Sequence, residues 1–432
     1  MAEGLKRAAV IGGGYAGIAA ALRLAENGIP VTLFEAGKVF GGRARVVDYH
    51  GIRLDNGQHL LLGAYRETLG MIGRVGVREA FLRLPLALTV PGRFALRTPA
   101  LPAPFHLLLG LLNAQGLPLG ERLSAIRFAL RLRLMGFRLK QDSSVASLLQ
   151  KHGQDKNIGR LLWEPLCLAA LNTPIEQASA QVFLNVLRDS FSHARSDSDL
   201  VLPRTDLSAL LPDAATSLIR KLGGNILTSR RISRIETTDS GFTLHWKGGS
   251  EDFTHVICAA APQHAFPLLS SLPELAPAAE LIQKFSYQPI ATIYLQYPQR
   301  VQLPQPMLGL NGGWAQWVFD RGQTHGTPGL LAVVISAEGD YQQVPAEQLA
   351  ARIATELKQV FELPAPLWHK VIVEKRATFA CMAGIKRPDQ RTGLSGFYLA
   401  GDYTAGDYPA TIEGAVRSGV KCAELVADSI SN

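Results

Sequence analysis

Short apolar segments open the chain and flank one amphipathic segment. Ala8–Ile11 and Val31–Phe34 are mostly apolar runs of strand length, which is typical of buried strands in a parallel sheet. Between them, Ala16, Ala20 and Leu24 place small and apolar side chains at helical spacing. This alternation predicts a strand–helix–strand unit and therefore an α/β fold.

Further along the chain the same patterns predict more elements. Residues 46–54 and 86–98 alternate around turns, as expected of two β-hairpins. Residues 163–189 are predicted to be helical, as is the segment 118–140, and Asp55–His59 is predicted to lead into another helix. Strands are also expected within 232–258 and at 290–296, 314–319, 330–336 and 397–400, with a last helix from 411 onward.

A glycine motif joins the first strand to the first helix. In the sequence G-x-G-x-x-G, Gly12 permits a tight turn, Gly14 permits a pyrophosphate to approach the backbone, and Gly17 permits close helix–strand packing. The N–H groups and the dipole at the helix start favour phosphate. Glu35 ends the second strand, where a carboxylate accepts hydrogen bonds from ribose hydroxyls. These features indicate a dinucleotide site, against the alternative of a glycine turn that binds nothing.

The residues after Glu35 resemble the flavin-containing amine oxidase and phytoene desaturase superfamily. The sequence GGRAR places Gly42 and Arg43 where that superfamily has an arginine that meets the FAD pyrophosphate. The segment GFYLAGDYTAGDYPATIEGAVRSG, residues 396–419, resembles the superfamily's C-terminal flavin motif. Two nucleotide motifs at opposite ends of the chain indicate FAD, because NAD alone leaves the second motif unexplained.

This resemblance implies roles for individual residues. Asp402 is expected beside the ribityl chain or the pyrophosphate, Ile412 at a helix start near flavin O2, and Ile232 against the adenine. The segment DNGQH, residues 55–59, is expected to pass along the flavin ring. The residues expected to bind FAD non-covalently are Gly12, Gly14, Tyr15, Ala16, Gly17, Glu35, Ala36, Gly42, Arg43, Ala44, Asn56, Gly57, Gln58, Ile232, Ala260, Gly401, Asp402, Thr411, Ile412 and Ala415.

The candidates for catalysis are few. Gln58 and His59 would lie near the reactive face of the flavin, with His59 as a possible acid, but they are candidates by position only. The alternative for both is a capped turn whose polar side chains are satisfied within the protein. No other catalytic residue and no metal site is predicted.

The motifs also predict how the chain divides into domains. We expect an FAD-binding, Rossmann-like domain of the glutathione-reductase type, built from the separated segments 1–75, 205–265 and 370–432. The segments 76–204 and 266–369 are expected to form an inserted α+β substrate domain.

The middle segments resemble the hydroxysqualene dehydroxylase group, also called squalene-associated FAD-dependent desaturases. The matching sequences are WEPLCLAALNTP with the following ASA, and RATFA. This resemblance implies reductive removal of the allylic hydroxyl of hydroxysqualene, giving squalene in bacterial hopanoid and triterpene synthesis, with hydride from reduced FAD. The alternatives are oxidative desaturation of a carotenoid-type polyene, amine oxidation, for which the surroundings of Cys381 lack an aromatic cage, and a non-enzymatic FAD-bound scaffold.

Composition adds a possible membrane surface. The chain has 432 residues, of which 47% are hydrophobic, and a net charge of +8. Residues 119–140 carry six Lys or Arg and one acid, interleaved with aliphatic residues. We expect membrane-facing helices near 99–140, with arginine heads at phosphate level. Nucleic acid binding is not expected, because aromatic residues for base stacking are missing from this pattern.

Several expectations concern the surroundings of the protein. The first residues, MAEGLKRAAV, lack a secretory signal pattern, so we expect a cytoplasmic protein associated peripherally with the inner face of the membrane. The expected partner is a long-chain isoprenoid substrate, whereas neither the electron donor nor the oligomeric state can be inferred. The four cysteines show no C-x-x-C spacing and are expected to be reduced thiols: Cys167, Cys258, Cys381 and Cys422.

Overall fold

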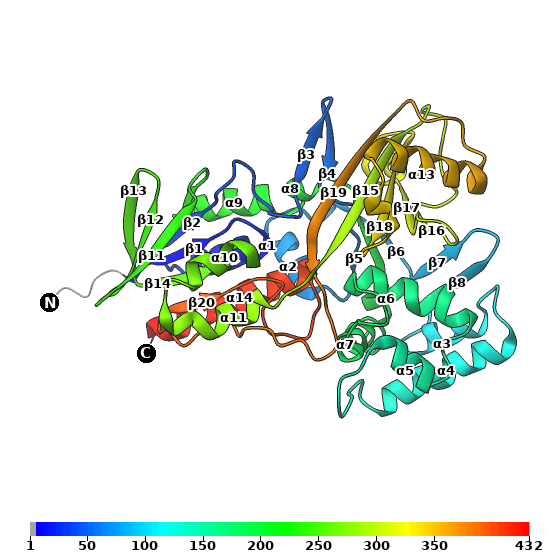
Figure 1. Ribbon diagram of the computed structural model, residues 1–432, viewed down its shortest axis with the longest axis horizontal. Coiled ribbons are helices and arrows are strands. Elements are labelled where there is room, and N and C mark those ends of the chain that lie inside the picture. Colours follow the sequence, from blue (N-terminus) through cyan, green and yellow to red (C-terminus); the bar gives the residue numbers. More distant parts are fainter. Residues whose placement is uncertain (1–5, 432) are drawn as a thin grey trace.

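The computed structural model describes residues 6–431 and shows an elongated α/β molecule (Figure 1). A parallel sheet lies at one end, and an antiparallel sheet and a group of helices lie at the other (Figure 1). Residues 1–5 of the first predicted FAD segment and residue 432 of the last one lie outside the described residues.

The parallel sheet confirms the predicted α/β fold class. Its strand order is β10-β2-β1-β14-β20, and every neighbouring pair is parallel. The order brings together residues from both ends of the chain, because β1 and β20 lie on either side of β14. The bounds are Ala8–Ile11 for β1, Val31–Phe34 for β2, Asn225–Leu227 for β10, His255–Cys258 for β14 and Phe397–Leu399 for β20.

Helix α1 (Tyr15–Glu26) packs closely on β1 and on the C-terminal helix α14 (Ile412–Ser431). A Cβ atom at Gly17 would lie 1.9 Å from the Gly12 carbonyl oxygen, and one at Gly419 would lie 2.1 Å from the Ala16 carbonyl oxygen. Only glycine permits both contacts. Gly17 lets α1 pack closely on the turn after β1, and Gly419 lets the C-terminal helix pack closely on α1. The neighbouring helices are α8 (Leu207–Leu210), α9 (Pro212–Lys221), α10 (Pro262–Leu269) and α11 (Ala276–Gln283).

A small antiparallel sheet extends this end of the molecule. It contains β11 (Ile232–Thr238), β12 (Gly241–Trp246) and β13 (Gly249–Phe253). Trp246 and Phe253 pack against Phe34 at the end of β2, with ring centroids 5.3 and 5.8 Å away.

The second large sheet has the order β16-β17-β18-β15-β19 and is antiparallel. Helix α13 (Ala346–Phe361) packs against it around a separate apolar core, and α12 (Arg321–His325) connects β17 to β18. Strand β19 crosses the predicted domain boundary at residue 370. The strands are β15 (Tyr287–Gln296), β16 (Met307–Gly309), β17 (Trp317–Asp320), β18 (Leu330–Ser336) and β19 (Trp368–Phe379).

Further helices and short strands lie beside this sheet, except for α2 (Arg66–Arg74), which packs on α14 (Figure 1). The other helices are α3 (Phe105–Leu112), α4 (Leu119–Leu134), α5 (Val145–Lys151), α6 (Glu164–Leu171) and α7 (Ala180–Phe191). The short strands are β3 (Val46–Tyr49), β4 (Ile52–Asp55), β5 (Leu61–Leu62), β6 (Phe81–Leu84), β7 (Ala87–Val90), β8 (Phe94–Arg97) and β9 (Leu200–Pro203).

Three predicted helices differ from the structure. The residues after His59 form β5, which pairs with distant β9, and helix α2 starts only at Arg66. The helix predicted over 163–189 breaks at Asn172, whose φ of 46° is left-handed, and continues as α7. Helix α4 ends at Leu134 because the next residues turn into the left-handed region at Gly136. Within residues 6–431, no helix is both long and apolar enough to span a bilayer.

Candidate active site

A large cavity of about 930 Å³ runs past the carboxyl ends of β1, β2, β14 and β20. Ligands of open α/β sheets bind at this edge, where loops follow the strands. The structure brings most of the predicted FAD-binding residues together here. The predicted residues that line this cavity are Gly12, Gly14, Tyr15, Ala16, Glu35, Ala36, Gly42, Arg43, Ala44, Ile232, Ala260, Gly401, Asp402, Thr411, Ile412 and Ala415.

The start of α1 has free space over its backbone. A Cβ atom at Gly14 would meet only the Gly42 Cα, at 4.0 Å, and the φ of Gly14 is −76°. The protein itself therefore does not require glycine at this position. Gly14 is also the N-cap of α1 and supplies no side-chain acceptor, so the first-turn N–H groups face the cavity without a cap. Both features suit an anionic ligand that approaches the backbone.

Glu35 is held rigidly beside the glycine turn that precedes α1. One carboxylate oxygen accepts from the Gly13 N–H at 2.7 Å, and the other accepts from the Gly37 N–H at 2.6 Å. Each oxygen keeps a lone pair for a further donor. The carboxylate is thus oriented before any ribose hydroxyl reaches it.

Arg43 connects three distant parts of the chain. Its guanidinium donates to the Asp402 carboxylate and to the Ala377 carbonyl oxygen, both at 2.7 Å. Asp402 is almost fully buried and lines the large cavity, and Arg43 lines both this cavity and a second one beside it. More cations than acids line the large cavity, which favours an anionic ligand. The cations are Lys38, Arg43, Arg45, Arg230 and Arg231, and the acids are Glu35, Glu374 and Asp402.

A second cavity of about 260 Å³ continues from this point between the second sheet and helices α6 and α7. Its walls are mainly aliphatic and aromatic, including Leu88, Leu166, Phe183, Leu187 and Phe319. The predicted residues Asn56, Gly57 and Gln58 line this apolar cavity instead of the large one, whereas Gly17 lines neither. The residues shared by both cavities are Arg43, His59, Glu374, Ala377, Ala410, Thr411 and Ile412.

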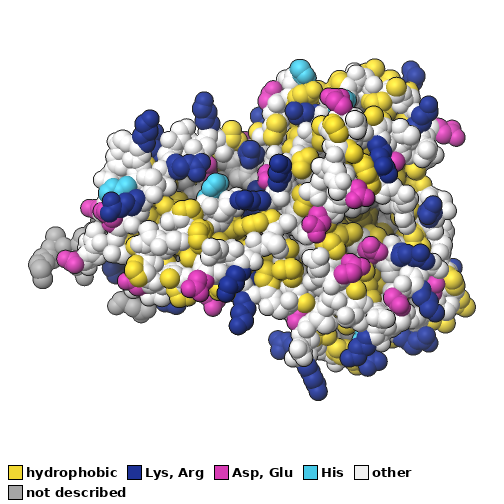
Figure 2. All heavy atoms as spheres, viewed as in Figure 1, with side chains coloured by type: hydrophobic (Ala, Val, Ile, Leu, Met, Phe, Trp, Pro, Cys, Tyr) yellow, Lys and Arg dark blue, Asp and Glu magenta, His cyan; other side chains and the backbone are white. Residues whose placement is uncertain are grey.

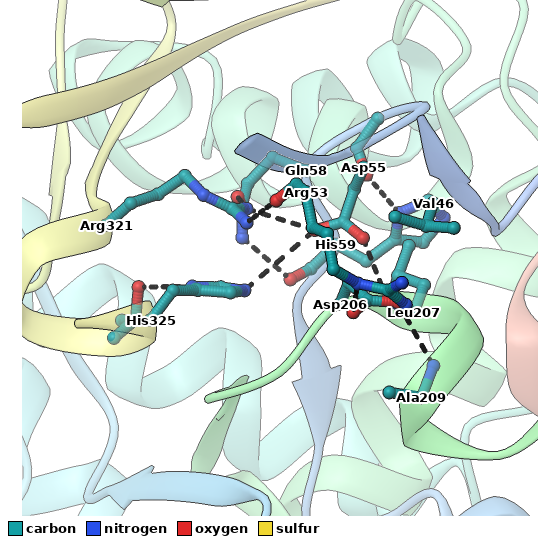
Figure 3. Close-up of polar contacts among 12 residues, drawn as sticks. Val46, Arg53, Asp55, Gln58, His59, Asp206, Leu207, Ala209, Arg321 and His325 are labelled. Atoms are coloured by element: carbon teal, nitrogen blue, oxygen red, sulfur yellow. Dashed lines mark hydrogen bonds and ion pairs between the residues drawn. The ribbon is translucent and has the colours of Figure 1, made fainter. Parts of the chain in front are cut away.

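A buried ionic network fixes the DNGQH segment between the two cavities (Figure 3). Arg321, at the start of α12, donates from Nη1 to the Asp55 carboxylate at 3.0 Å and to the Gln58 side-chain oxygen at 3.1 Å. Arg321 is only 1% exposed and Asp55 only 2%. Burial raises the pKa of Asp55, and the charge of Arg321 opposes that rise. The network orients the Gln58 amide by holding its oxygen.

His59 is neutral in this arrangement. Its Nδ1 lies 2.7 Å from the Gly57 carbonyl oxygen, and because a carbonyl only accepts, Nδ1 carries the hydrogen. Burial lowers the pKa of His59, so Nε2 holds a lone pair at neutral pH. The geometry therefore favours His59 as a hydrogen-bond acceptor and disfavours it as the acid considered from the sequence.

Four polar residues of the site were missed by sequence reasoning. Glu374 on β19 lies at the junction of the two cavities, where its carboxylate accepts from the Asn56 amide at 3.2 Å. Arg321 lies in no motif, and its partner Asp55 is distant in sequence. The sequence around Glu374 and Arg321 gives no reason to single them out, because a lone charged residue in a strand or at a helix start is common on protein surfaces. The consecutive Arg230 and Arg231 were a visible signal, but nothing in the sequence placed them at the cavity.

Comparison with known proteins agrees with this geometry. The family described as flavin containing amine oxidoreductase matches residues 15–427. The chain belongs to this family. Its relatives include a hydroxysqualene dehydroxylase of Rhodopseudomonas palustris, 30% identical over 96% of this chain and 97% of the relative. They also include a 15-cis-phytoene desaturase of Solanum lycopersicum, 25% identical over 96% of this chain and 77% of that protein.

A solved structure supports the fold independently. Cyclohexylamine oxidase from Brevibacterium oxydans superposes with a TM-score of 0.72 at 17% identity, covering 99% of this chain and all of that one. The resemblance inferred from the flavin motifs is thus confirmed. The protein is an oxidoreductase of a flavin-dependent family, and the large cavity has the backbone approach and positive lining that a flavin nucleotide requires.

Replacing Gly14 by alanine tests the cofactor cavity. Because the new Cβ meets only open space in the protein, the Gly14→Ala variant should fold with an unchanged melting temperature when no flavin is present. Its affinity for flavin should be about ten-fold lower, since the methyl group takes space that the ligand uses. Flavin absorbance after gel filtration measures retention. Equal retention by the variant and the parent would place the ligand elsewhere.

The pH dependence of stability tests the buried network, because the buried His325 lies beside it, with Nε2 3.9 Å from the Asp55 carboxylate. Burial, followed by the neighbouring charge of Arg321, lowers the pKa of His325 to about 3, whereas unfolded histidine titrates near 6.5. The unfolded state binds the extra proton, so stability should fall as the pH drops below 6.5. Between pH 7.5 and 5 this group should remove about 2 kcal/mol from the free energy of unfolding.

The variant His325→Gln should lack this part of the pH dependence, whereas His193→Gln, at an exposed position, should keep it. Urea unfolding at the two pH values measures the difference. A His325→Gln variant that loses as much stability as the parent would show that His325 is not buried as a neutral group.

Proposed function

We propose that the protein is an FAD-dependent oxidoreductase that removes the allylic hydroxyl of hydroxysqualene reductively and releases squalene, a step of bacterial hopanoid and triterpene synthesis. The observation that carries this proposal is an apolar cavity that opens on the predicted flavin site and has polar groups mainly at that junction. The similarity to a hydroxysqualene dehydroxylase over 96% of the chain supports the choice of reaction.

FAD, bound without a covalent link, fits the large cavity best. The cavity extends from Glu35, which would hold the adenosine ribose, past the uncapped start of α1 to Asp402 and Thr411. Such a length suits a dinucleotide. The thiol of Cys381 lines neither cavity, and burial raises its pKa to about 12, so it offers no thiolate for attachment to a flavin.

The apolar cavity suits a long hydrocarbon. Binding of such a substrate comes from burial of CH₂ groups, at about 0.8 kcal/mol each, and the walls offer few polar partners. The polar side chains of His59 and Glu374 lie where the two cavities meet, and Gln58 lines the apolar cavity next to His59. An alcohol would therefore be oriented with its hydroxyl toward the flavin.

The reaction breaks a C–O bond, forms a C–H bond with the hydride that reduced FAD supplies, and releases the oxygen as water after it accepts one proton. The chain's residues orient the alcohol and stabilise charge. Gln58 has its oxygen held by Arg321 and one amide hydrogen on the His59 carbonyl oxygen at 3.3 Å, leaving one N–H for the departing oxygen. The Glu374 carboxylate faces the region where positive charge develops on the allylic carbon.

Anaerobic turnover tests the proposal. The FAD-loaded protein, reduced with dithionite, should convert hydroxysqualene to a product that lacks the oxygen, detected by mass spectrometry. The phytoene desaturase relative favours one alternative, oxidative desaturation of a polyene. Oxidised enzyme that extends the conjugation of phytoene, seen as new visible absorbance, while hydroxysqualene remains unchanged would establish that alternative.

Glu374→Gln tests the proposed electrostatic role. The variant keeps an oxygen that can accept from Asn56 but loses the negative charge. We expect kcat to fall about 10²-fold, comparable to loss of one preorganised electrostatic partner, with little change in KM or in FAD retention. Stopped-flow oxidation of the reduced flavin by hydroxysqualene measures the chemical step. A rate equal to that of the parent would exclude Glu374 from charge stabilisation.

A further inference from the structure

The exposed apolar side chains of the molecule gather on one surface. Of the fourteen large hydrophobic side chains that are exposed within residues 6–431, nine lie between residues 101 and 135. Phe105 is 61% exposed and Leu134 is 89% exposed. We call these residues the α3–α4 surface: Leu101, Phe105, Leu109, Leu112, Leu119, Leu123, Leu130, Leu134 and Met135.

Helix α4 is apolar on two opposite faces. Ala125, Phe128 and Leu132 are buried against the body of the protein, whereas Leu123, Leu130 and Leu134 point outward. A helix of a soluble protein normally exposes charged and polar residues on its outer face. An exposed apolar patch of this kind marks a surface that contacts another apolar phase.

The same surface is strongly basic. Residues 101–140 contain six Lys or Arg and a single acid, Glu121. That carboxylate accepts from the backbone N–H of Ile158 at 2.8 Å and from the Asn157 amide at 3.1 Å, so it is directed toward the protein. Figure 2 shows Lys and Arg side chains gathered over the region where Figure 1 places α3, α4 and α5. The exposed cations are Arg127, Arg131, Arg133, Arg138 and Lys140.

A narrow crevice lies between this surface and the apolar cavity. The crevice, about 30 Å³, lies between α3, α4 and α7, and the half-exposed Leu130 forms part of its wall. Leu187 and Phe191 line the crevice on one side and the apolar cavity on the other. A shift of these two α7 side chains would therefore join the surface to the substrate cavity through a path with mainly apolar walls, on which Arg133 and Ser192 are the polar residues of the crevice.

We propose that the α3–α4 surface docks onto a lipid bilayer that contains anionic headgroups, and that the hydrocarbon substrate passes between α3 and α4 into the apolar cavity. Outward leucines and Phe105 insert among the acyl chains, and the arginines between them reach the phosphates. The passage of substrate from the bilayer depends on the proposed function. The docking is inferred from the α3–α4 surface alone. Cations interleaved with leucines, in a segment whose one acid is directed toward the protein, suit anionic lipid better than a protein partner, whose apolar contacts normally exclude charge.

Vesicle binding tests the docking. The FAD-loaded protein should sediment with vesicles of phosphatidylcholine and phosphatidylglycerol, and less with phosphatidylcholine alone or in high salt. The double variant Phe105→Ser/Leu134→Ser should bind about ten-fold more weakly. The matched control Leu222→Ser/Leu367→Ser changes two exposed leucines elsewhere, 45% and 68% exposed, and should bind like the parent.

A parent that does not sediment with anionic vesicles, or a double variant that binds equally, overturns the docking. Loss of a dimer by the Phe105→Ser/Leu134→Ser variant in gel filtration, with no vesicle binding by the parent, would instead assign the surface to a second copy of the chain. Equal melting temperatures of the variants exclude a folding defect as the cause of any difference.

Turnover of substrate presented in vesicles or in detergent tests the passage between α3 and α4 separately from the docking. Ala129→Phe fills the crevice at a residue that lies neither in the α3–α4 surface nor on the wall of the apolar cavity. It should leave vesicle binding and turnover of detergent-dispersed hydroxysqualene unchanged, but slow turnover of hydroxysqualene held in vesicles about ten-fold. Equal rates from vesicles overturn the passage. Absence of turnover in every format overturns the proposed function and leaves the docking to be judged by sedimentation alone.

Discussion

The active-site arrangement depends on one buried carboxylate, that of Asp55. Its oxygens accept from the Leu207 N–H at 2.8 Å and from Arg321 at 3.0 Å, and its carbonyl accepts from the Tyr294 hydroxyl at 3.0 Å. These partners belong to a helix beside the parallel sheet, to α12 and to the second sheet. Removing one partner would leave a buried charge without compensation, which costs several kcal/mol. The ion pair therefore holds both halves of the molecule in one geometry and fixes Gln58 and His59 between the cavities.

The two cavities differ in polarity because different parts of the fold build them. Loops after parallel strands supply backbone N–H groups and arginines, which suit a phosphate-bearing cofactor. Antiparallel strands and helices α6 and α7 supply alternating apolar side chains, which suit a hydrocarbon. The region where the two cavities meet has few polar groups. The position of a substrate's polar atoms therefore decides its orientation in the apolar cavity. The same fold can thus oxidise amines or act on isoprenoids, depending on this second lining.

The cofactor half was largely predictable, whereas the reacting end was not. The glycine motif, Glu35, Arg43 and the C-terminal segment lie in local patterns whose spacing reflects strand–turn–helix geometry, and the structure places them along one cavity. Asn56, Gly57 and Gln58 were expected beside the flavin and line the apolar cavity next to it. Glu374 and Arg321 could not be found, since their positions follow from how β19 and α12 pack against segments far away in the sequence.

The sequence by itself determined the parallel strands, the glycine turn and the unusual charge and apolarity of residues 101–140, because these follow from local periodicity and composition. It also indicated the flavin family, through the resemblance of its two nucleotide motifs to that family. Tertiary structure alone decided that residues after His59 pair with β9 as a strand, that one face of α4 stays exposed, and that His59 is neutral. Strand pairing, exposure and pKa depend on contacts between distant residues, and their free energies outweigh the local preferences that a sequence pattern records.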